Sequence, residues 1–315
     1  MIDFRYHLVS LIAVFLAVAL GIVIGTTALN EPILADIKNQ VTDLEKDKRS
    51  LEDRTQQLQA RLDSTDAFEE AVAPALVAGA LSRAKVVLIT TGENVASETV
   101  DQVTTLITEA GGTVSGSLAL QPAFSDPSSA SALSGYVTGG GLPATVTLPQ
   151  TDDAGQLVGS ALAQVLMIPA DGGAAADGTS VSSVVAGLVA LDVLTQTSDS
   201  LEPANYAVVL TAGAFEGDDA AERSTTVTEL VSALDSVGSG SVVSGDATSA
   251  GQNGLVGAIR DDPSLSSAVS TVDNVGSVAG GISTVLALGA EAKGTSGRYG
   301  TGEDTQPVPP VPSAP

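Results

Sequence analysis

The distribution of hydrophobic positions divides the chain into an apolar run, a helical repeat and a long alternating region. Residues 8–29 carry no charged side chain. At about 1.5 Å per residue, a helix of this length spans the roughly 30 Å of a bilayer core. The run is longer than the apolar stretch of a secretory signal, and Thr26-Thr27-Ala28 makes a poor cleavage site. The pattern therefore predicts a retained transmembrane helix, with residues 1–29 as cytoplasmic start and membrane span.

The residues in and around this run suggest an orientation and a packing face. Arg5 precedes the helix and Glu31 is the first charge after it, so the positive-inside tendency favours a cytoplasmic start and an extracytoplasmic bulk. Small residues recur at every fourth position, at Ala13, Ala17, Gly21 and Gly25. Such spacing lets two helices approach closely, although Ala and Gly are also common in membrane helices generally. A paired helix is the first expectation, and a helix surrounded only by lipid is the alternative.

After Pro32 the apolar positions follow a heptad repeat. Its a and d positions are Leu34, Ile37, Val41, Leu44, Lys48, Leu51, Thr55, Leu58 and Leu62. Leu at most d positions and polar residues at two a positions favour a parallel two-stranded coiled coil. Asp47 would face Glu52 of a partner, which weakens the prediction, and an amphipathic helix packed on its own domain would show a similar stripe. We expect a homodimeric coiled coil over residues 30–73, and Pro74 and Gly79 mark where the helix gives way to the next domain.

Beyond this repeat, short apolar runs alternate with helical patterns. The runs that predict strands are residues 85–90, 113–120, 207–211, 242–243 and 268–274. Helical patterns stand between them, and the last follows over about 280–292. This alternation is typical of a mostly parallel sheet covered on both faces. We therefore predict an extracytoplasmic α/β domain over residues 74–292.

The middle and the end of this region are less regular. Residues 125–141 are rich in Ser, Gly and Pro and predict a loop or a short helix. Residues 157–166 and 184–194 show helical patterns, and a loop is expected between them. Residues 293–315 close on a Pro-rich stretch, which predicts a disordered tail.

Composition limits the chemistry of the chain. The formal net charge is -24, and residues 86–222 contain neither Lys nor Arg, so a nucleic acid is not expected as a partner. There is no Cys and one histidine, His7, while Met1 and Met167 are the two methionines. Zinc and copper sites need such ligands, and triad catalysis needs a His base. We expect no enzymatic activity, no cofactor and no metal site.

Two loops follow strands at positions where α/β domains often bind ligands. Residues 90–94 lack the glycines of a phosphate-binding loop, and Glu93 opposes an anion. The corresponding second loop carries Glu216, Asp218 and Asp219. These carboxylates either favour the start of the next helix through its dipole or could hold Ca²⁺ or Mg²⁺.

Three motifs resemble one actinobacterial family. They are Phe4-Arg5-Tyr6-His7, Ser270-Thr271-Val272-Asp273-Asn274, and Tyr299-Gly300. The chain is similar, in the order of its parts, to the family of the mycobacterial copper transport protein MctB and the corynebacterial cell-separation protein SteB. That resemblance implies either copper export or control of a peptidoglycan hydrolase during daughter-cell separation, together with a SteA-like membrane protein.

The residues favour cell separation over copper transport. Soft ligands are scarce, a pore would need more spanning segments, and Arg298 stands where the family pattern often has His. We therefore expect an envelope scaffold or activator that pairs with a SteA-like protein and offers its coiled coil to a hydrolase. Phe4, Arg5, Tyr6 and His7 would contact that partner or, alternatively, the membrane interface. Copper homeostasis remains the alternative function.

Overall fold

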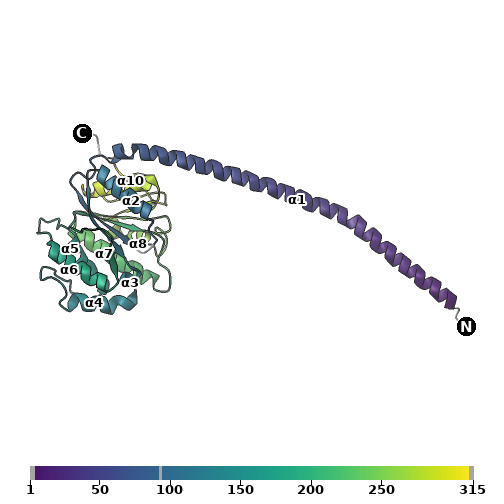
Figure 1. Cartoon of the computed structure of the whole chain (residues 1–315), viewed down its shortest axis with the longest axis horizontal. Helices are drawn as coiled ribbons and strands as arrows, with labels where there is room; N and C mark the ends of the chain where they lie inside the picture. Colours follow the sequence, from purple (N-terminus) through teal and green to yellow (C-terminus); the bar gives the residue numbers. More distant parts are fainter. Residues whose placement is uncertain (1–3, 92–93, 312–315) are drawn as a thin grey trace. The chain divides into compact units, whose positions relative to one another are not determined.

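The computed structural model describes residues 4–91 and 94–311. For residues 26–35 it describes the backbone and not the side chains. Helix α1 runs without interruption over Phe4–Val77 (Figure 1). Residues up to Thr65 form one unit, and residues from Asp66 onward form a second. The helix ends at Val77, between Pro74 and Gly79, which the sequence marks as the place where it gives way to the next domain. Burial of Ala73 and Val77 in the second unit offsets the backbone hydrogen bond that Pro74 cannot donate.

The second unit is built on a seven-stranded sheet with the order β3-β2-β1-β4-β5-β6-β7. The strands are β1 (Lys85–Thr91), β2 (Thr113–Leu120), β3 (Leu194–Gln196), β4 (Tyr206–Thr211), β5 (Ser241–Ser244), β6 (Ser270–Val272) and β7 (Arg298–Tyr299). All neighbours pair in parallel except β2 and β3, which are antiparallel. The predicted α/β fold with a mostly parallel sheet is thereby confirmed.

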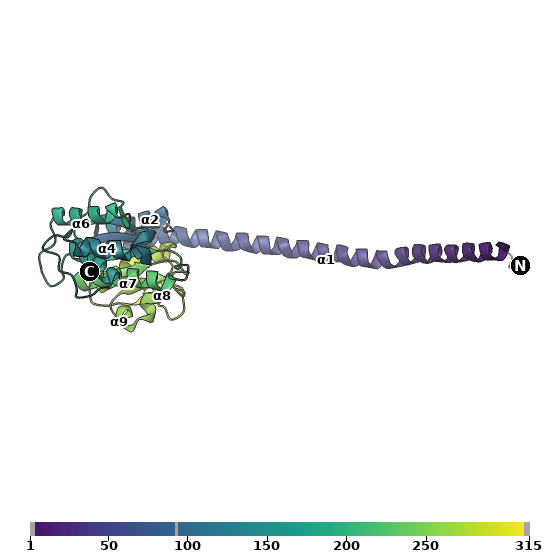
Figure 2. The same cartoon turned by 90° about the horizontal axis from the view of Figure 1, so that it is seen from below.

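Helices cover both faces of this sheet. One layer consists of α2 (Ser97–Glu109) and α10 (Val278–Glu291), which lie side by side in Figure 1. The opposite layer holds α3 (Pro122–Ser125), α4 (Ala130–Thr138), α5 (Ala154–Leu166), α6 (Gly178–Ala190), α7 (Ala220–Val237), α8 (Leu255–Asp261) and α9 (Pro263–Ser266). Figure 2 views the domain from this second layer, with α4, α7 and α8 labelled.

The central strands are buried on both faces because their side chains alternate between two cores. Val86 and Leu88 of β1 pack under α2 and α10, whereas Val87 and Ile89 pack under α5 and α7. In β4, every residue after Tyr206 is buried. These strands therefore require continuous apolar sequences rather than alternating apolar and polar residues, and the sequence has such apolar runs.

Two expected elements differ in extent from the structure. The helix expected over residues 184–194 ends at Ala190, because Asp192 adopts a left-handed φ of 58° and Leu194 begins β3, paired with Leu120 of β2. The strand expected over residues 268–274 is confined to β6. Residues 125–141, expected to be a loop or a short helix, begin at the last residue of α3 and contain the short 3₁₀ turn Pro127–Ser129 and α4.

The disordered tail predicted from residue 293 needs correction. Strand β7 pairs with β6, and the side chain of Tyr299 is 2% exposed. Beyond it, the amide of Gly300 donates to the carbonyl of Gln306 (3.0 Å), and the amide of Gln306 donates to the carbonyl of Arg298 (2.8 Å). A strand of two residues has too little apolar sequence to be recognised, since its stability comes from pairing and from the burial of one tyrosine.

Candidate functional site

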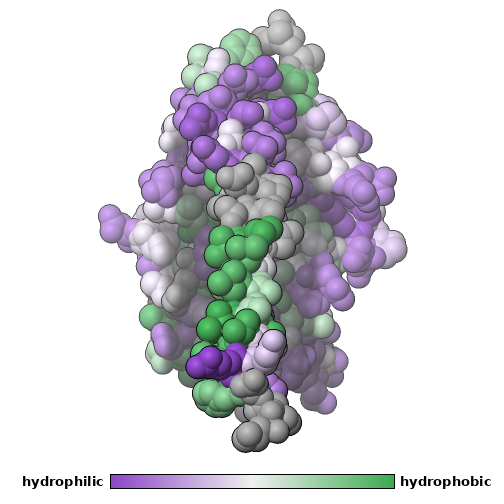
Figure 3. All heavy atoms as spheres, turned by 90° about the vertical axis from the view of Figure 1, so that its right-hand side faces the viewer, coloured by the Kyte–Doolittle hydropathy of each residue, from purple (hydrophilic) through white to green (hydrophobic). Residues whose placement is uncertain are grey.

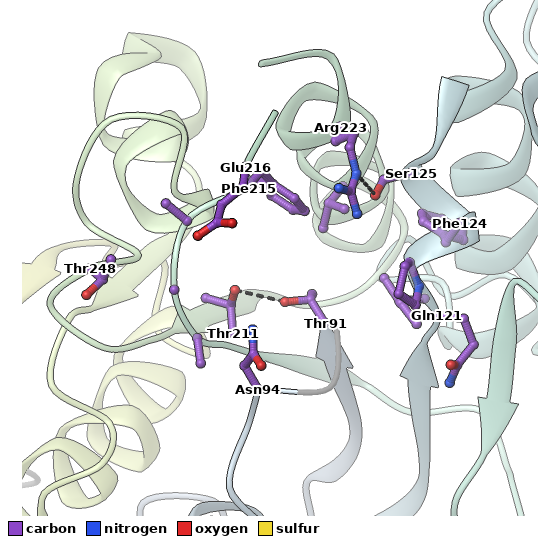
Figure 4. A pocket seen from close by; sticks show the side chains of 16 residues that line it. Thr91, Asn94, Gln121, Phe124, Ser125, Thr211, Phe215, Glu216, Arg223 and Thr248 are labelled. Carbon is purple, nitrogen blue, oxygen red and sulfur yellow. Dashed lines mark hydrogen bonds between the residues drawn. The ribbon is translucent and has the colours of Figure 1, made fainter. Parts of the chain in front are cut away.

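A cleft of about 460 Å³ opens at the carboxyl ends of β1 and β4. The chain leaves β1 toward β2 on one side of the sheet, while β4 lies on its other side, so this is the topological switch point of the sheet. In open parallel sheets, ligands bind in the crevice at such a point. Figure 4 shows the side chains that line the cleft, which come from the strand ends, α3, the loop after β4 and the first turns of α7.

The floor of the cleft is polar, and its walls combine apolar side chains with polar ones. At the floor, the Thr91 hydroxyl donates to the Thr211 hydroxyl at 2.8 Å, and both residues are buried. Phe124 and Phe215 supply aromatic walls (Figure 4). Arg223, in the first turn of α7, places its guanidinium carbon 5.5 Å from the centre of the Phe215 ring. Its Nε lies 3.5 Å from the Ser125 hydroxyl oxygen.

The loop after β4 is held firmly at the edge of the cleft. Gly213 adopts a φ of 73°, which glycine accommodates without strain. Its amide donates to Asp246 Oδ1 at 3.0 Å, and the same oxygen accepts from the amide of Ser249 at 2.8 Å. The amide of Phe215 donates to the carbonyl of Asn253 at 3.1 Å. Phe215 therefore has a fixed position against Arg223.

The described acidic residues of the second loop do not assemble into a metal site. Glu216 is exposed and lines the cleft, and Asp219 precedes α7 without a side-chain capping hydrogen bond. Among the described residues, no three His, Asp or Glu side chains gather so that they could hold a metal ion. Glu93 lies outside the described residues. Asn94, from the first loop, does line the cleft.

The family motifs near the end of the chain meet in one cluster around the buried Asp273. We call it the clasp, and it consists of Arg260, Thr271, Asp273, Tyr299, Thr301 and Gly302. Arg260 Nη1 lies 2.8 Å from Asp273 Oδ2, and their side chains are 10% and 1% exposed. Arg260 also donates to the Thr271 hydroxyl (2.9 Å) and to the Tyr299 carbonyl (3.0 Å). The clasp thus ties β7 to β6 and α8.

Backbone amides complete the coordination of the Asp273 carboxylate. The amide of Thr301 donates to Oδ1 at 2.7 Å and that of Gly302 to Oδ2 at 3.2 Å. Burial alone would raise the pKa of Asp273, but these hydrogen bonds and the Arg260 charge hold it below its ordinary value. Gly300 has a φ of 127°, and a Cβ there would overlap Asp273 Oδ1. Ser270, Thr271, Val272, Asp273, Tyr299 and Gly300 therefore serve the fold.

A second buried acid, Glu291 of α10, lies beneath the same strands. Its Oε1 accepts from the Ser270 amide (2.8 Å) and the Ser270 hydroxyl (2.5 Å). Burial raises the pKa of Glu291 to about 7; the Ser270 hydrogen bonds oppose this shift, and the charge of Asp235 adds to it. Burial also raises the pKa of Asp235 to about 6. Sequence patterns alone gave no sign of this pair, because the two acids come from different helices.

The membrane-associated residues of the sequence analysis lie on the surface of α1. The apolar segment Phe4–Gly25 is long enough to cross a membrane, and Figure 3 shows the hydrophobic surface along this end of the helix. Phe4 and Tyr6 are each 79% exposed. Beyond this segment, the heptad residues are about half or more exposed: Ile37, Val41, Leu44, Leu51, Leu58 and Leu62. The side chain of Leu34 is outside the described set.

Soft metal ligands do not assemble in the second unit. Met167 is fully buried in the core under α5 and α7, and His7 lies on the exposed surface of α1 in the other unit. With no Cys in the sequence, these two side chains and Met1 are the soft ligands that the chain offers. Arg298 stands where the family pattern often has His, which counted against a copper role. In the structure its Nη2 donates to the Arg260 carbonyl at 2.6 Å.

Comparisons with known proteins match the chain over nearly its whole length. A family model described as "Copper transport outer membrane protein, MctB" matches residues 1–310. The "Copper transporter MctB" of Mycobacterium tuberculosis (strain ATCC 25618 / H37Rv) is 31% identical, over 98% of this chain and 99% of its own length. The protein of the same name from Mycobacterium leprae (strain TN) is 32% identical, over 87% and 88% of the two chains. These names refer to copper transport, and none refers to cell separation.

Proposed function

Because the chain belongs to the MctB family of copper transport proteins, we propose that it acts in copper homeostasis at the cell envelope, as a protein anchored by the helical segment Phe4–Gly25. The observation that carries this proposal is the family match over residues 1–310. The sequence analysis favoured control of peptidoglycan hydrolysis with a SteA-like partner. The comparisons give that function no support, so the copper role, its alternative, takes first place.

The proposed mode of action is through protein contacts rather than through copper ligands of the α/β domain. Met167 is buried in the core, and the domain has neither Cys nor His. Cu(I) prefers thiolate, thioether and imidazole ligands, which this domain does not present at its surface. One spanning helix and a folded domain suit a component that works beside a transport partner in the membrane.

Loss of the gene separates the two functions. We expect the deletion strain to grow more poorly than its parent in copper-supplemented medium, while its cells separate normally. Growth curves over a range of copper concentrations and microscopy of cell chains measure both traits in the same cultures. Chained cells with unchanged copper tolerance would contradict the copper role and restore the cell-separation hypothesis.

The anchor is proposed to lie in the plasma membrane with its short start in the cytoplasm. Arg5 before the span carries the positive-inside argument, and an apolar helix of 22 residues fits the bilayer core. The family description names the outer membrane, so the location needs a direct measurement.

The absence of Cys from the sequence makes this topology simple to measure. In spheroplasts, a membrane-impermeant maleimide is expected to label Lys293→Cys, because Lys293 is exposed on the α/β domain. The same reagent should label Asp3→Cys only after the membrane is permeabilised. Labelling of Asp3→Cys in intact spheroplasts, with Lys293→Cys protected, would reverse the proposed orientation, and recovery in an outer-membrane fraction would contradict the plasma-membrane location.

We also propose that α1 pairs with a second copy of the chain. The exposed stripe between Ile37 and Leu62 keeps the a and d spacing of a two-stranded coiled coil. Lys48, at a polar a position of this stripe, forms an i,i+4 ion pair with Glu52 at 3.5 Å. In the membrane, the small residues Ala13, Ala17, Gly21 and Gly25 would form a separate face on which two helices can approach closely. A dimer would present its outer surface to a transport partner.

Two leucines of the stripe test the dimer. In residues 30–315, Leu51→Glu combined with Leu58→Glu is expected to give a monomer, because four carboxylates would face one another in the seam. Light scattering after gel filtration measures the mass. The matched control is Ser50→Glu with Gln57→Glu, which adds the same charge on the outer face and should leave a dimer. An unchanged mass for the leucine variant would refute the coiled coil.

A further inference from the structure

The structure assigns a binding site to the cleft at the switch point of the sheet: we propose that it takes a small organic acid, with one carboxylate on a partly apolar body. This function is additional to the proposed copper role and does not depend on it. The site consists of Arg223 above, the Thr211 hydroxyl at the floor and the aromatic rings of Phe124 and Phe215 between them (Figure 4). Its volume of about 460 Å³ lies within the range of small-molecule sites, roughly 300–1,000 Å³.

The position of positive charge points to this cleft. Arg223 is the single Lys or Arg between Val86 and Ile259 of a chain with a net charge of -24. Among the described residues, no carboxylate oxygen comes within 4.0 Å of a guanidinium nitrogen of Arg223. The guanidinium is instead oriented by the Phe215 ring and the Ser125 hydroxyl. Its two Nη groups remain available to bind an anion in the forked geometry that suits a carboxylate.

A buried hydroxyl at the floor supplies the second observation. Thr211 is 4% exposed, and its Oγ1 accepts from Thr91. The two hydroxyls share a single hydrogen bond, so one of their two protons has no acceptor among the residues that the structure describes. Buried polar groups are satisfied in the great majority of cases, so a hydroxyl of this kind facing a cleft marks a place for an acceptor. An oxygen of the bound acid, directly or through water, would complete the hydrogen bonds of Thr211.

The chemistry of the walls distinguishes a carboxylate from a phosphate. A phosphate-binding loop donates several backbone amides, but the amide of Gly213 is already bound to the carboxylate of Asp246. Glu216 also lines the cleft, and it would repel a dianion more strongly than a monoanion. The two phenylalanine rings and Leu120 favour an apolar body over a compact inorganic ion.

Binding is tested on the full-length chain in nanodiscs by saturation-transfer NMR. The probes are phenylacetate and N-acetylalanine, each paired with its uncharged amide, phenylacetamide or N-acetylalaninamide. We expect saturable binding of at least one acid, with its amide bound about tenfold or more weakly, because the amide lacks the charge that pairs with Arg223. Inorganic phosphate at equal concentration should not displace the acid.

Variants locate the binding in this cleft. Arg223→Ala is expected to weaken binding of the acid about tenfold or more, and Arg223→Lys less, because lysine keeps the charge without the forked donor geometry. Thr211→Val should also weaken binding, because it removes the hydroxyl at the floor of the cleft without changing the net charge. This variant still tests the site if Arg223→Ala fails to fold. Lys293→Ala, the same loss of charge at an exposed position, should bind as the parent does.

Four results would overturn the proposal. The first two are no saturable binding of either acid and equal binding of an acid and its amide. The other two are full binding by folded Arg223→Ala or Thr211→Val, and displacement by phosphate with the affinity of the acid. The melting temperature of each variant shows whether it is folded.

Discussion

Replacement of Asp273 by alanine is expected to lower the free energy of unfolding of the α/β domain by about 3–5 kcal/mol, because it leaves a buried guanidinium without its partner. Arg260 is 10% exposed and Asp273 1%, so water cannot replace the lost carboxylate easily. The amides of Thr301 and Gly302 would lose their acceptor as well. The loss should release β7 from the edge of the sheet.

Denaturant unfolding followed by tyrosine fluorescence measures this effect, since Tyr299 is buried in the clasp. Asp261→Ala is the matched control, because it removes the same charge at an exposed position beside Arg260 and should change the stability by less than about 0.5 kcal/mol. Gly300→Ala should be destabilising too, through its overlap with Asp273. Equal stability of Asp273→Ala and Asp261→Ala would show that the clasp does not hold the fold.

A second large effect is expected from pH. The pKa values of Glu291 and Asp235 are raised by burial, to about 7 and about 6. Between about pH 4 and 7 the folded chain therefore binds more protons than the unfolded chain, and the free energy of unfolding falls as pH rises. The contribution is fully present below the ordinary pKa of these acids and is lost as pH passes through the raised values.

Melting temperatures measured from pH 5 to pH 8 test this prediction. The parent should melt several degrees lower at pH 8, since a domain of this size shifts by about 2–4 °C per kcal/mol. Glu291→Gln should remove roughly half of the difference, because an amide does not titrate in this range while its oxygen still accepts from Ser270. Glu109→Gln, at an exposed position of α2, should keep the parent's profile. A parent whose melting temperature rises from pH 5 to pH 8 would contradict the assignment.

Three strands were predicted to within one residue. β1 and β4 are buried almost throughout, and such central parallel strands need continuous apolar runs. β2 has the expected bounds although its sequence is more polar and several of its residues are partly exposed. β3 and β7 escaped prediction because they are held by pairing with a neighbour rather than by their own composition. Leu194 lies opposite Leu120, and Tyr299 is fixed by contacts with residues distant in sequence.

Part of the candidate site could be predicted from the sequence. The loops after β1 and β4 were marked as a place for ligands, and the structure brings Asn94 and Glu216 to one cleft. Arg223 was missed, although it is the first basic residue after a long stretch without any. Its role depends on Phe215 and Ser125, which only the folded chain places beside it. The motif around Asp273, which carried part of the family resemblance, forms a structural clasp through its partners.

The central claim is that this member of the MctB family keeps cellular copper low, and the copper content of the cells tests it most directly. The deletion strain and its parent are grown in copper below the toxic concentration, and the copper content of their cells is measured by elemental mass spectrometry. We predict a higher copper content in the deletion strain than in the parent, and a return to the parent's value when the full-length chain or its His7→Ala variant is supplied. A copper content that is unchanged by deletion of the gene would contradict the account.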